Sequence, residues 1–155
     1  MKRAASWPPS SMRERHSRGS VVVDTGVLGA RLKPGGSDLA FAYRAILEGR
    51  PAVVSLVTVA ELRFGATIAG WGTRRLQRLG EELAGVETIW PNQRLTDVYV
   101  ALRAACVRAG HGLGHKQHEA DRWIAATALW LGVPLVSHDA IFGSVDRLEL
   151  LTRRG

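Results

Sequence analysis

The stretch Val21-Val22-Val23-Asp24 determines the fold class, because a carboxylate directly follows a run of β-branched apolar residues. Three such residues in a row predict a short strand that is buried on both faces of a sheet. Strand-like runs recur at residues 52–55 and 133–138, and patterns typical of helices separate them. Strands that alternate with helices predict an α/β domain with a mainly parallel central sheet and helices on both faces.

The length of 155 residues fits a single domain with a substantial core. Ser37 is an expected helix N-cap, and Gly49 and Gly132 are expected helix stops. We expect residues 20–155 to form the domain and residues 1–19 to form a disordered basic extension. The expected helices and remaining strands follow from hydrophobic periodicity: helices over 25–32, 37–48, 58–69, 73–84, 96–109 and 119–131, and strands over 87–90 and 148–151.

The net charge of +7 and the pI near 10.7 favour a polyanionic partner such as a nucleic acid. Five basic side chains against Glu14 give residues 1–19 a net charge of +4, so residues 20–155 carry only +3. Much of the positive charge therefore belongs to the extension. The sequence leaves open whether this extension is a functional basic arm or an overlong start, with Met12 as the alternative first residue.

Cys106 is the single cysteine, which excludes an internal disulfide and fits the reducing cytoplasm. It lies in the apolar phase of an expected helix, so we expect a buried filler and not a nucleophile. No apolar stretch approaches the ~18–20 residues of a membrane span. The N-terminus has charge but lacks the apolar core of a secretory signal. We therefore predict a cytoplasmic protein that does not enter a membrane.

Four acidic residues stand at apolar junctions, where a carboxylate is costly. Asp24 and Asp139 follow predicted strands, at the edge where functional groups gather in parallel sheets. Glu61 lies in an apolar helical stripe that includes Phe64, and Asp121 opens a helix that is apolar nearly all round. Carboxylates that meet in one pocket repel each other, and a hard divalent cation relieves that repulsion.

Each acid also has an ordinary structural interpretation. Glu61 is compatible with a solvated glutamate at the edge of the apolar stripe. Asp121 is compatible with an acid that stabilises the helix dipole, worth roughly 0.3–1 kcal/mol. Asp24 and Asp139 fit helix caps or turn formers. Taken singly, these interpretations are about as good as a catalytic one. The matching placement of all four acids favours one functional site.

Phosphodiester hydrolysis is the chemistry that fits such a site. Mg²⁺ and Mn²⁺ prefer hard oxygen ligands, and one or two such ions activate water and neutralise charge on the phosphoryl group. Thr25 and Ser137, beside the strand ends, either orient such a water or make ordinary turn hydrogen bonds. Glu119 is a candidate further ligand, although an exposed acid in a first helical turn is the better interpretation.

Four segments in order resemble a PIN-domain ribonuclease of the VapC toxin type. They are Val22-Val-Asp-Thr25, Val59-Ala-Glu-Leu-Arg-Phe-Gly65, residues 119–129 and Pro134-Leu-Val-Ser-His-Asp139. The resemblance covers residues 20–151, and it implies that Asp24, Glu61, Asp121 and Asp139 bind Mg²⁺ or Mn²⁺. It also implies an RNA substrate, a homodimer, and inhibition by a cognate VapB-type antitoxin whose tail occupies the active-site groove.

Two features depart from this family pattern. Gly26 stands where Ser or Asn commonly follows the Asp-Thr pair, which removes a helper hydroxyl or amide but leaves the metal site. The extension before the first strand is also atypical, because such chains usually begin close to that strand.

Other candidate sites carry weaker signals. His111, His115 and His118 are closely spaced, but the interleaved glycines predict a loop, which argues against zinc. Trp123 and Trp130 are expected to pack in the core or at a dimer interface, although tryptophan can also stack on unpaired bases. Seven basic residues can contact a phosphate backbone or lie on solvated helix faces: Arg74, Arg75, Arg78, Arg103, Arg108, Lys116 and Arg122.

The sequence thus predicts a Mg²⁺- or Mn²⁺-dependent endoribonuclease, the toxin of a type II toxin–antitoxin pair, that hydrolyses RNA with a metal-activated water. The alternative is a catalytically silent PIN-fold module that binds RNA or a protein. A nuclease that acts on DNA is a third hypothesis.

Overall fold

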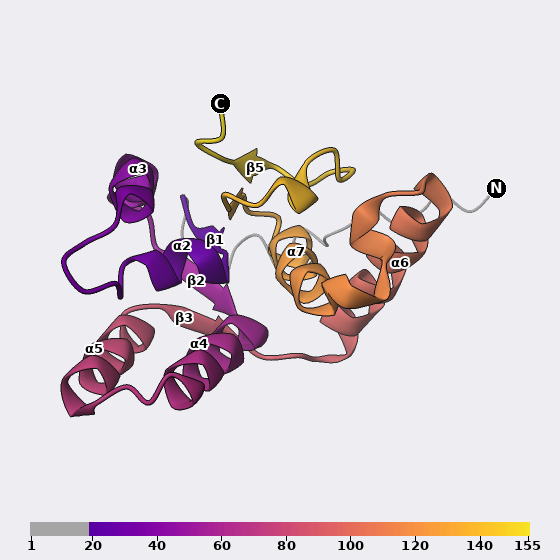
Figure 1. The fold of residues 1–155 in the computed structure, drawn as a ribbon. Coiled ribbons are helices and arrows are strands. Elements are labelled where there is room, and N and C mark those ends of the chain that lie inside the picture. Colours follow the sequence, from indigo (N-terminus) through magenta and orange to yellow (C-terminus); the bar gives the residue numbers. More distant parts are fainter. Residues whose placement is uncertain (1–18) are drawn as a thin grey trace.

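The computed structural model describes residues 19–155, and their strands form one five-stranded sheet (Figure 1). The strand order is β3-β2-β1-β4-β5, and every neighbouring pair is parallel. The strands are β1 (Val21–Val23), β2 (Ala52–Ser55), β3 (Glu87–Ile89), β4 (Leu135–Val136) and β5 (Leu150–Leu151). The predicted α/β class is confirmed, and the sheet is wholly parallel in this part of the chain.

Six α-helices and three short 3-10 helices connect the strands within residues 19–155. They are α2 (Thr25–Ala30), α3 (Asp38–Leu47), α4 (Leu56–Ile68), α5 (Thr73–Ala84), α6 (Gln93–Ala109), η1 (Gly112–Gly114), η2 (Lys116–His118), α7 (Glu119–Leu131) and η3 (Ala140–Phe142). None of these helices is long and apolar enough to cross a bilayer. The predicted disorder of residues 1–19 concerns a segment that lies outside the described residues, apart from Gly19.

Side-chain caps explain where the helices begin. The predicted N-cap Ser37 is confirmed, because its hydroxyl accepts a hydrogen bond from the Ala40 amide at 3.4 Å. Ser55 ends β2 and caps α4, so that helix begins two residues before its predicted start. Asn92 caps α6 and extends it by three residues toward the N-terminus. Gly132 ends α7 in the left-handed conformation, as predicted.

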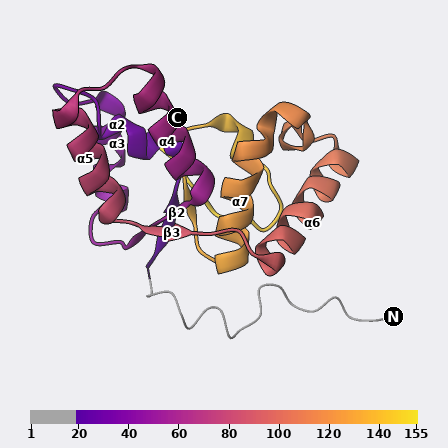
Figure 2. The same ribbon diagram turned by 90° about the horizontal axis from the view of Figure 1, so that it is seen from below.

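The two faces of the sheet carry separate cores. Val22, Val53 and Leu135 pack with residues of α6 and α7, whereas Val21 and Val23 point to the other face. That second face packs with α2 and α3, and the expected helices on both faces are therefore confirmed. In Figure 2, α6 lies outside α7 on one flank, and α5 lies outside α4 on the other.

The register of the central strands fixes where their carboxyl ends meet. Val23 of β1 stands opposite Val136 of β4. The Asp24 amide donates to the Val136 carbonyl at 3.0 Å, so Asp24 and Ser137 leave the sheet side by side. Residues 113 positions apart in the chain are thereby neighbours at the carboxyl edge of the sheet.

Arg122 is the largest fully buried side chain of the described residues, with an exposed fraction of 1%. Its guanidinium donates to the Tyr99 hydroxyl at 3.1 Å, to the Leu113 carbonyl at 3.0 Å and to the His115 carbonyl. Both alternatives stated for Arg122, a phosphate contact and a solvated helix face, are therefore wrong. The apolar α7 helix turns this side chain inward, where its donors hold the loop between α6 and α7 in place.

We expect R122M to lower the free energy of unfolding by about 2–4 kcal/mol, because methionine has a similar length but leaves the Leu113 and His115 carbonyls without their donor. Denaturant unfolding at neutral pH measures this loss. The matched control is R108M, at an exposed position of α6, for which we expect a change within about 0.5 kcal/mol. Equal stability of the two variants would contradict a structural role for Arg122.

Candidate active site

The four predicted acids come from elements that meet at the carboxyl edge of the sheet. Asp24 follows β1 directly and caps α2, and Asp139 lies three residues after β4 and caps η3. Glu61 lies in the middle of α4, which follows β2, and Asp121 lies in the first turn of α7. Parallel strands place such residues on one side of the domain.

Asp24 is buried, with an exposed fraction of 8%, and both its carboxylate oxygens accept hydrogen bonds. Oδ1 accepts from the Thr25 amide at 2.8 Å, and Oδ2 accepts from the Ser137 hydroxyl at 2.7 Å. The Ser137 oxygen in turn accepts from the Asp139 amide at 3.0 Å. Ser137 therefore links the ends of β1 and β4 and fixes the direction of the Asp24 carboxylate.

Glu61 reaches the site from α4 through Thr25. The Thr25 hydroxyl donates to Glu61 Oε1 at 2.8 Å and lies 3.0 Å from the hydroxyl of Thr58. The predicted apolar stripe around Glu61 is not a core face, because Phe64 and Ile68 are 68% and 72% exposed. The sequence pattern gave the wrong phase: α4 buries Thr58 on one side and leaves these apolar side chains outside.

Asp121 and Asp139 are more open to solvent than Asp24. The His118 Nδ1 nitrogen lies 2.8 Å from Asp121 Oδ2, and both side chains are 27% exposed. Since an ionised carboxylate only accepts hydrogen bonds, Nδ1 carries the hydrogen in this pair. Asp139 is exposed, and its Oδ1 accepts from the Ile141 amide at 2.9 Å.

Burial raises the pKa of Asp24 from 3.8 to about 6. The hydrogen bonds from Ser137 and Thr25 lower this pKa, but by less than burial raises it. The carboxylates of Asp121 and Asp139 add electrostatic repulsion and raise it further. Asp24 thus lies at the buried end of a group of three neighbouring aspartates.

The side chains form a convergent carboxylate group but not a finished cage for a cation. As they stand, no three His, Cys, Asp or Glu side chains of residues 19–155 are placed so that together they hold a metal ion. Glu61 is turned to Thr25, and Asp121 is turned to His118. Both side chains are accessible to solvent.

Comparison with known proteins assigns the fold to a family. The profile of the PIN domain matches residues 21–148, which is most of the chain. The chain belongs to the PIN-domain family. It is 31% identical over 94 residues to Ribonuclease VapC5 of Mycobacterium tuberculosis, a match that covers 59% of this chain and 67% of that protein.

Two solved structures that share this fold carry the name VapBC, a family of toxin–antitoxin systems. VapBC-5 from Mycobacterium tuberculosis matches with a TM-score of 0.63 and 26% identity, over 86% of this chain and 98% of that chain. VapBC2 from Rickettsia felis, bound to a promoter DNA fragment, matches with a TM-score of 0.71 and 19% identity, over 85% of this chain and 97% of that chain. The predicted resemblance to VapC-type PIN domains is confirmed.

Tyr43 is a residue of this PIN domain that the sequence pattern did not reveal. Its hydroxyl donates to the Ser137 carbonyl at 3.1 Å, lies 2.9 Å from His138 Nδ1, and accepts from the Arg153 amide at 2.8 Å. This buried hydroxyl therefore ties α3 and the C-terminal segment to the residues just before Asp139. No sequence signal connects positions 43 and 137, because only the folded sheet brings them together.

The other candidate side chains have structural partners. His111 Nδ1 accepts from the Leu113 amide at 3.0 Å, and its Nε2 lies 2.7 Å from the Gly143 carbonyl, so this imidazole joins two loops. Trp130 is buried, and Trp123 stacks on Tyr99 at 4.1 Å, which confirms the expected packing of both tryptophans. The expected burial of Cys106 is also confirmed.

Removal of the Asp24 charge should stabilise the metal-free PIN domain at neutral pH. The pKa of Asp24 in the folded protein lies above its unfolded value of 3.8. The stability that its bound proton contributes is therefore fully present below pH 3.8 and is lost as the pH rises through about 6. We expect D24N to raise the free energy of unfolding at pH 7 by on the order of 2–3 kcal/mol, with a difference that shrinks toward pH 4. Denaturant titrations in chelator at both pH values measure it.

The matched control for this prediction is D97N, because Asp97 is exposed on α6. We expect no such gain of stability in D97N. A D24N protein that is no more stable than the wild type at pH 7 would contradict the cost assigned to the buried carboxylate.

Proposed function

We propose that this PIN-domain protein is a Mg²⁺- or Mn²⁺-dependent endoribonuclease and the toxin of a type II toxin–antitoxin pair. The observation that carries the proposal is the buried Asp24 carboxylate, whose pKa is raised by burial and by repulsion from Asp121 and Asp139. A bound cation would offset the cost of ionising this buried carboxylate. The 31% identity to a protein named as a ribonuclease supports RNA as the substrate.

The donor set fits a hard divalent cation. Asp24, Glu61, Asp121 and Asp139 supply only carboxylate oxygens, which Mg²⁺ and Mn²⁺ prefer over nitrogen or sulfur. No thiol lies in the site, since Cys106 is buried in the helix α6. We propose that these four side chains hold the ion, with Asp24 as the fixed ligand and Glu61 and Asp121 as the ligands that turn inward.

The protein's own groups position these ligands. When bound, the ion activates a water and neutralises charge on the phosphodiester. The Ser137 hydroxyl and the Thr25 amide fix both oxygens of Asp24, and the Thr25 hydroxyl orients Glu61. His118 orients Asp121 through its Nδ1 hydrogen. The hydroxyls of Thr25 and Ser137 thus both contact carboxylates. In this proposal they orient those carboxylates and do not orient a water.

A VapB-type antitoxin and a second copy of the chain are the proposed protein partners. Three large apolar side chains are strongly exposed on α3 and α4: Phe41, Phe64 and Ile68. Phe64 and Ile68 lie one and two turns beyond Glu61, so an antitoxin tail that covers them also reaches the acids. Exposed Val100 and Val107 on α6 offer a separate apolar surface for a homodimer.

Loss of single carboxylates should abolish RNA cleavage. We expect D24N and D121N each to lower the cleavage rate by about 10²-fold or more with Mg²⁺ or Mn²⁺, because each change removes a charged ligand. Cleavage of labelled RNA by purified full-length variants measures the rates, with the exposed D97N as the control of unchanged activity. Full activity in both site variants would refute the metal-site assignment.

The same experiment separates the alternative functions. A wild-type protein that binds RNA but cleaves none with either metal would favour the catalytically silent module. DNA offered under identical salt tests the third hypothesis, and preferential cleavage of DNA would replace the ribonuclease by a deoxyribonuclease.

Cation affinity should fall in acid, because Asp24 must lose its proton to bind the ion. With a pKa of about 6 in the metal-free protein, the ionised fraction of Asp24 drops by about tenfold between pH 7.5 and pH 5. We expect the dissociation constant for Mn²⁺ to rise by at least that factor, as measured by calorimetric titration. An affinity that stays constant down to pH 4 would be incompatible with these ligands.

A further inference from the structure

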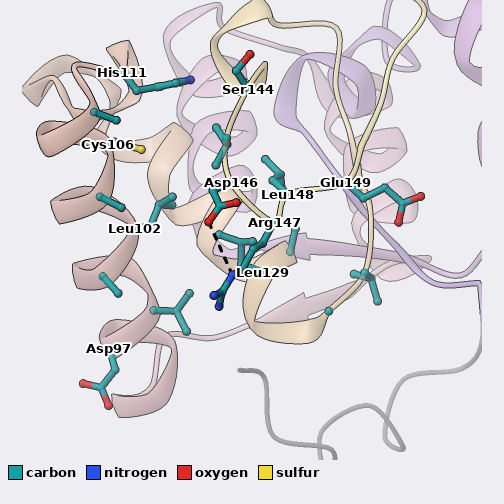
Figure 3. Close-up of a pocket in the computed structure, with 18 residues that line it drawn as sticks. Asp97, Leu102, Cys106, His111, Leu129, Ser144, Asp146, Arg147, Leu148 and Glu149 are labelled. Carbon is teal, nitrogen blue, oxygen red and sulfur yellow. Dashed lines mark ion pairs between the residues drawn. The ribbon is translucent and has the colours of Figure 1, made fainter. Parts of the chain in front are cut away.

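Two hollows on different flanks of the domain have linings of opposite character. The hollow between α6 and α7 is mostly apolar, and the carboxylates of Asp97 and Glu149 point away from it (Figure 3). The other hollow has a volume of about 930 Å³, lies beside α5 and is lined mainly by polar and charged side chains. We call it the basic hollow, because five arginines line it: Arg31, Arg50, Arg74, Arg75 and Arg78.

The basic hollow holds the whole charge excess of the domain. The five arginines stand against Glu81 and Glu82, which gives the lining a net charge of +3. Residues 20–155 also have a net charge of +3, so their basic and acidic side chains outside the hollow are equal in number. Positive charge that is concentrated in a concave surface favours a polyanionic ligand.

Two polar contacts hold the walls of the basic hollow together. Arg78 Nη2 donates to the Arg31 carbonyl at 2.7 Å, and Arg31 Nε lies 3.5 Å from Glu82 Oε2. These contacts join α5 to the C-terminal end of α2. Leu32 and Leu79, from the same two parts of the chain, belong to one small core cluster. The two walls are therefore fixed relative to each other.

The other three arginines of the basic hollow are available to a ligand. Arg50, Arg74 and Arg75 pair with no carboxylate of residues 19–155. The Arg75 guanidinium carbon lies 3.7 Å from the centroid of the Trp71 ring, and its buried Nε has no hydrogen-bond acceptor within these residues. Because Trp71 packs against the cluster that contains Leu79, this stacking restricts the Arg75 side chain before any ligand binds.

The basic hollow lies away from the four acids. Arg50 and Pro51 lead into β2, and Gly85 and Val86 lead into β3, so the hollow is at the amino edge of these strands. None of the four acids, which gather at the carboxyl edge, lines it. The two ends of the four-residue strand β2 are about 10 Å apart. A phosphate in the basic hollow therefore belongs to a different nucleotide from the one that is cleaved at the acids.

We propose that the basic hollow binds backbone phosphates of the RNA substrate at a distance from the cleaved bond. This role rests on the proposed function, because it takes RNA as the substrate. Arginine suits it, since the planar guanidinium forms paired hydrogen bonds with phosphate oxygens. Such contacts hold the strand without reading its sequence.

An acidic protein segment is the competing occupant, and the lining favours RNA over it. A protein segment gains most of its affinity from apolar contacts. The strongly exposed apolar side chains Phe41, Phe64 and Ile68 all lie outside the basic hollow. The hollow instead presents arginines and glutamates, which suit a charged and hydrated backbone.

RNA binding in the presence of a chelator tests this site without any cleavage. We expect R50Q/R74Q/R75Q in full-length protein to raise the dissociation constant for a single-stranded RNA of about 20 nucleotides by at least about tenfold near 0.1 M salt. The slope of log affinity against log salt should become shallower by about 2, because each lost phosphate contact of a single strand removes about 0.7. Fluorescence anisotropy of labelled RNA measures both quantities.

The matched control is R94Q/R103Q/R108Q, which removes the same charge from exposed positions of α6. It includes Arg103 and Arg108, two other predicted phosphate contacts, and we expect its dissociation constant to stay within about twofold of the wild type. R50Q/R74Q leaves Arg75 on Trp71 and protects the test against misfolding of the triple variant. We expect its salt slope to become shallower by about 1.4.

Each outcome decides between the hollow and its alternatives. Equal weakening by the two triple variants, or no RNA binding by the wild type, would overturn the proposed site. Poly-glutamate that binds the wild type at least as tightly as RNA, and is lost in R50Q/R74Q/R75Q, would assign the hollow to an acidic protein segment and would also overturn it. A wild type that cleaves no RNA but shows the expected affinity difference would refute the nuclease and support the hollow. Cleavage by the wild type with equal affinities in all variants would do the reverse.

Discussion

The burial of the Asp24 carboxylate at the end of the central strand is the constraint on which the site depends. Ser137 reaches across from β4 to bind one carboxylate oxygen, and the Thr25 amide binds the other, so the negative charge is fixed where water is scarce. These bonds also join β1 to β4 at their carboxyl ends. Burial at this position makes ionisation of Asp24 unfavourable, and the two hydrogen bonds offset only part of that cost.

This cost explains why function and stability oppose each other at the site. The metal-free fold holds a proton on Asp24 more tightly than the unfolded chain does, and repulsion from Asp121 and Asp139 strengthens that preference. In the proposed enzyme, a bound cation would favour the ionised form of Asp24 and so offset this cost. In the proposed enzyme the energetic penalty of the apo state thus becomes affinity for the ion, and the exposed Glu61 and Asp121 supply the adjustable part of the shell.

The sequence patterns correctly predicted features that depend on neighbouring residues. They failed for features that depend on contacts between residues far apart in the chain. The strands that precede Asp24 and Asp139, the Ser37 cap and the extent of α7 follow from short-range signals, and the structure confirms them. The phase of α4 was wrong because apolar residues such as Phe64 are exposed, which periodicity cannot detect. The burial of Arg122 was missed because its partners are backbone carbonyls of a loop, and that loop has no sequence signature.

The two edges of the sheet place different demands on the chain. At the carboxyl edge, capping side chains and strand ends gather acids that repel one another, and the site is shaped by charge. On the flank formed by α6 and α7, alanines on α6 leave space against α7, and Ser144 and Arg147, which have positive φ values, line that space. Helix α7 spans both edges, with Asp121 in its first turn and Gly132 at its end. The packing of α7 in the core therefore fixes where Asp121 stands relative to the sheet.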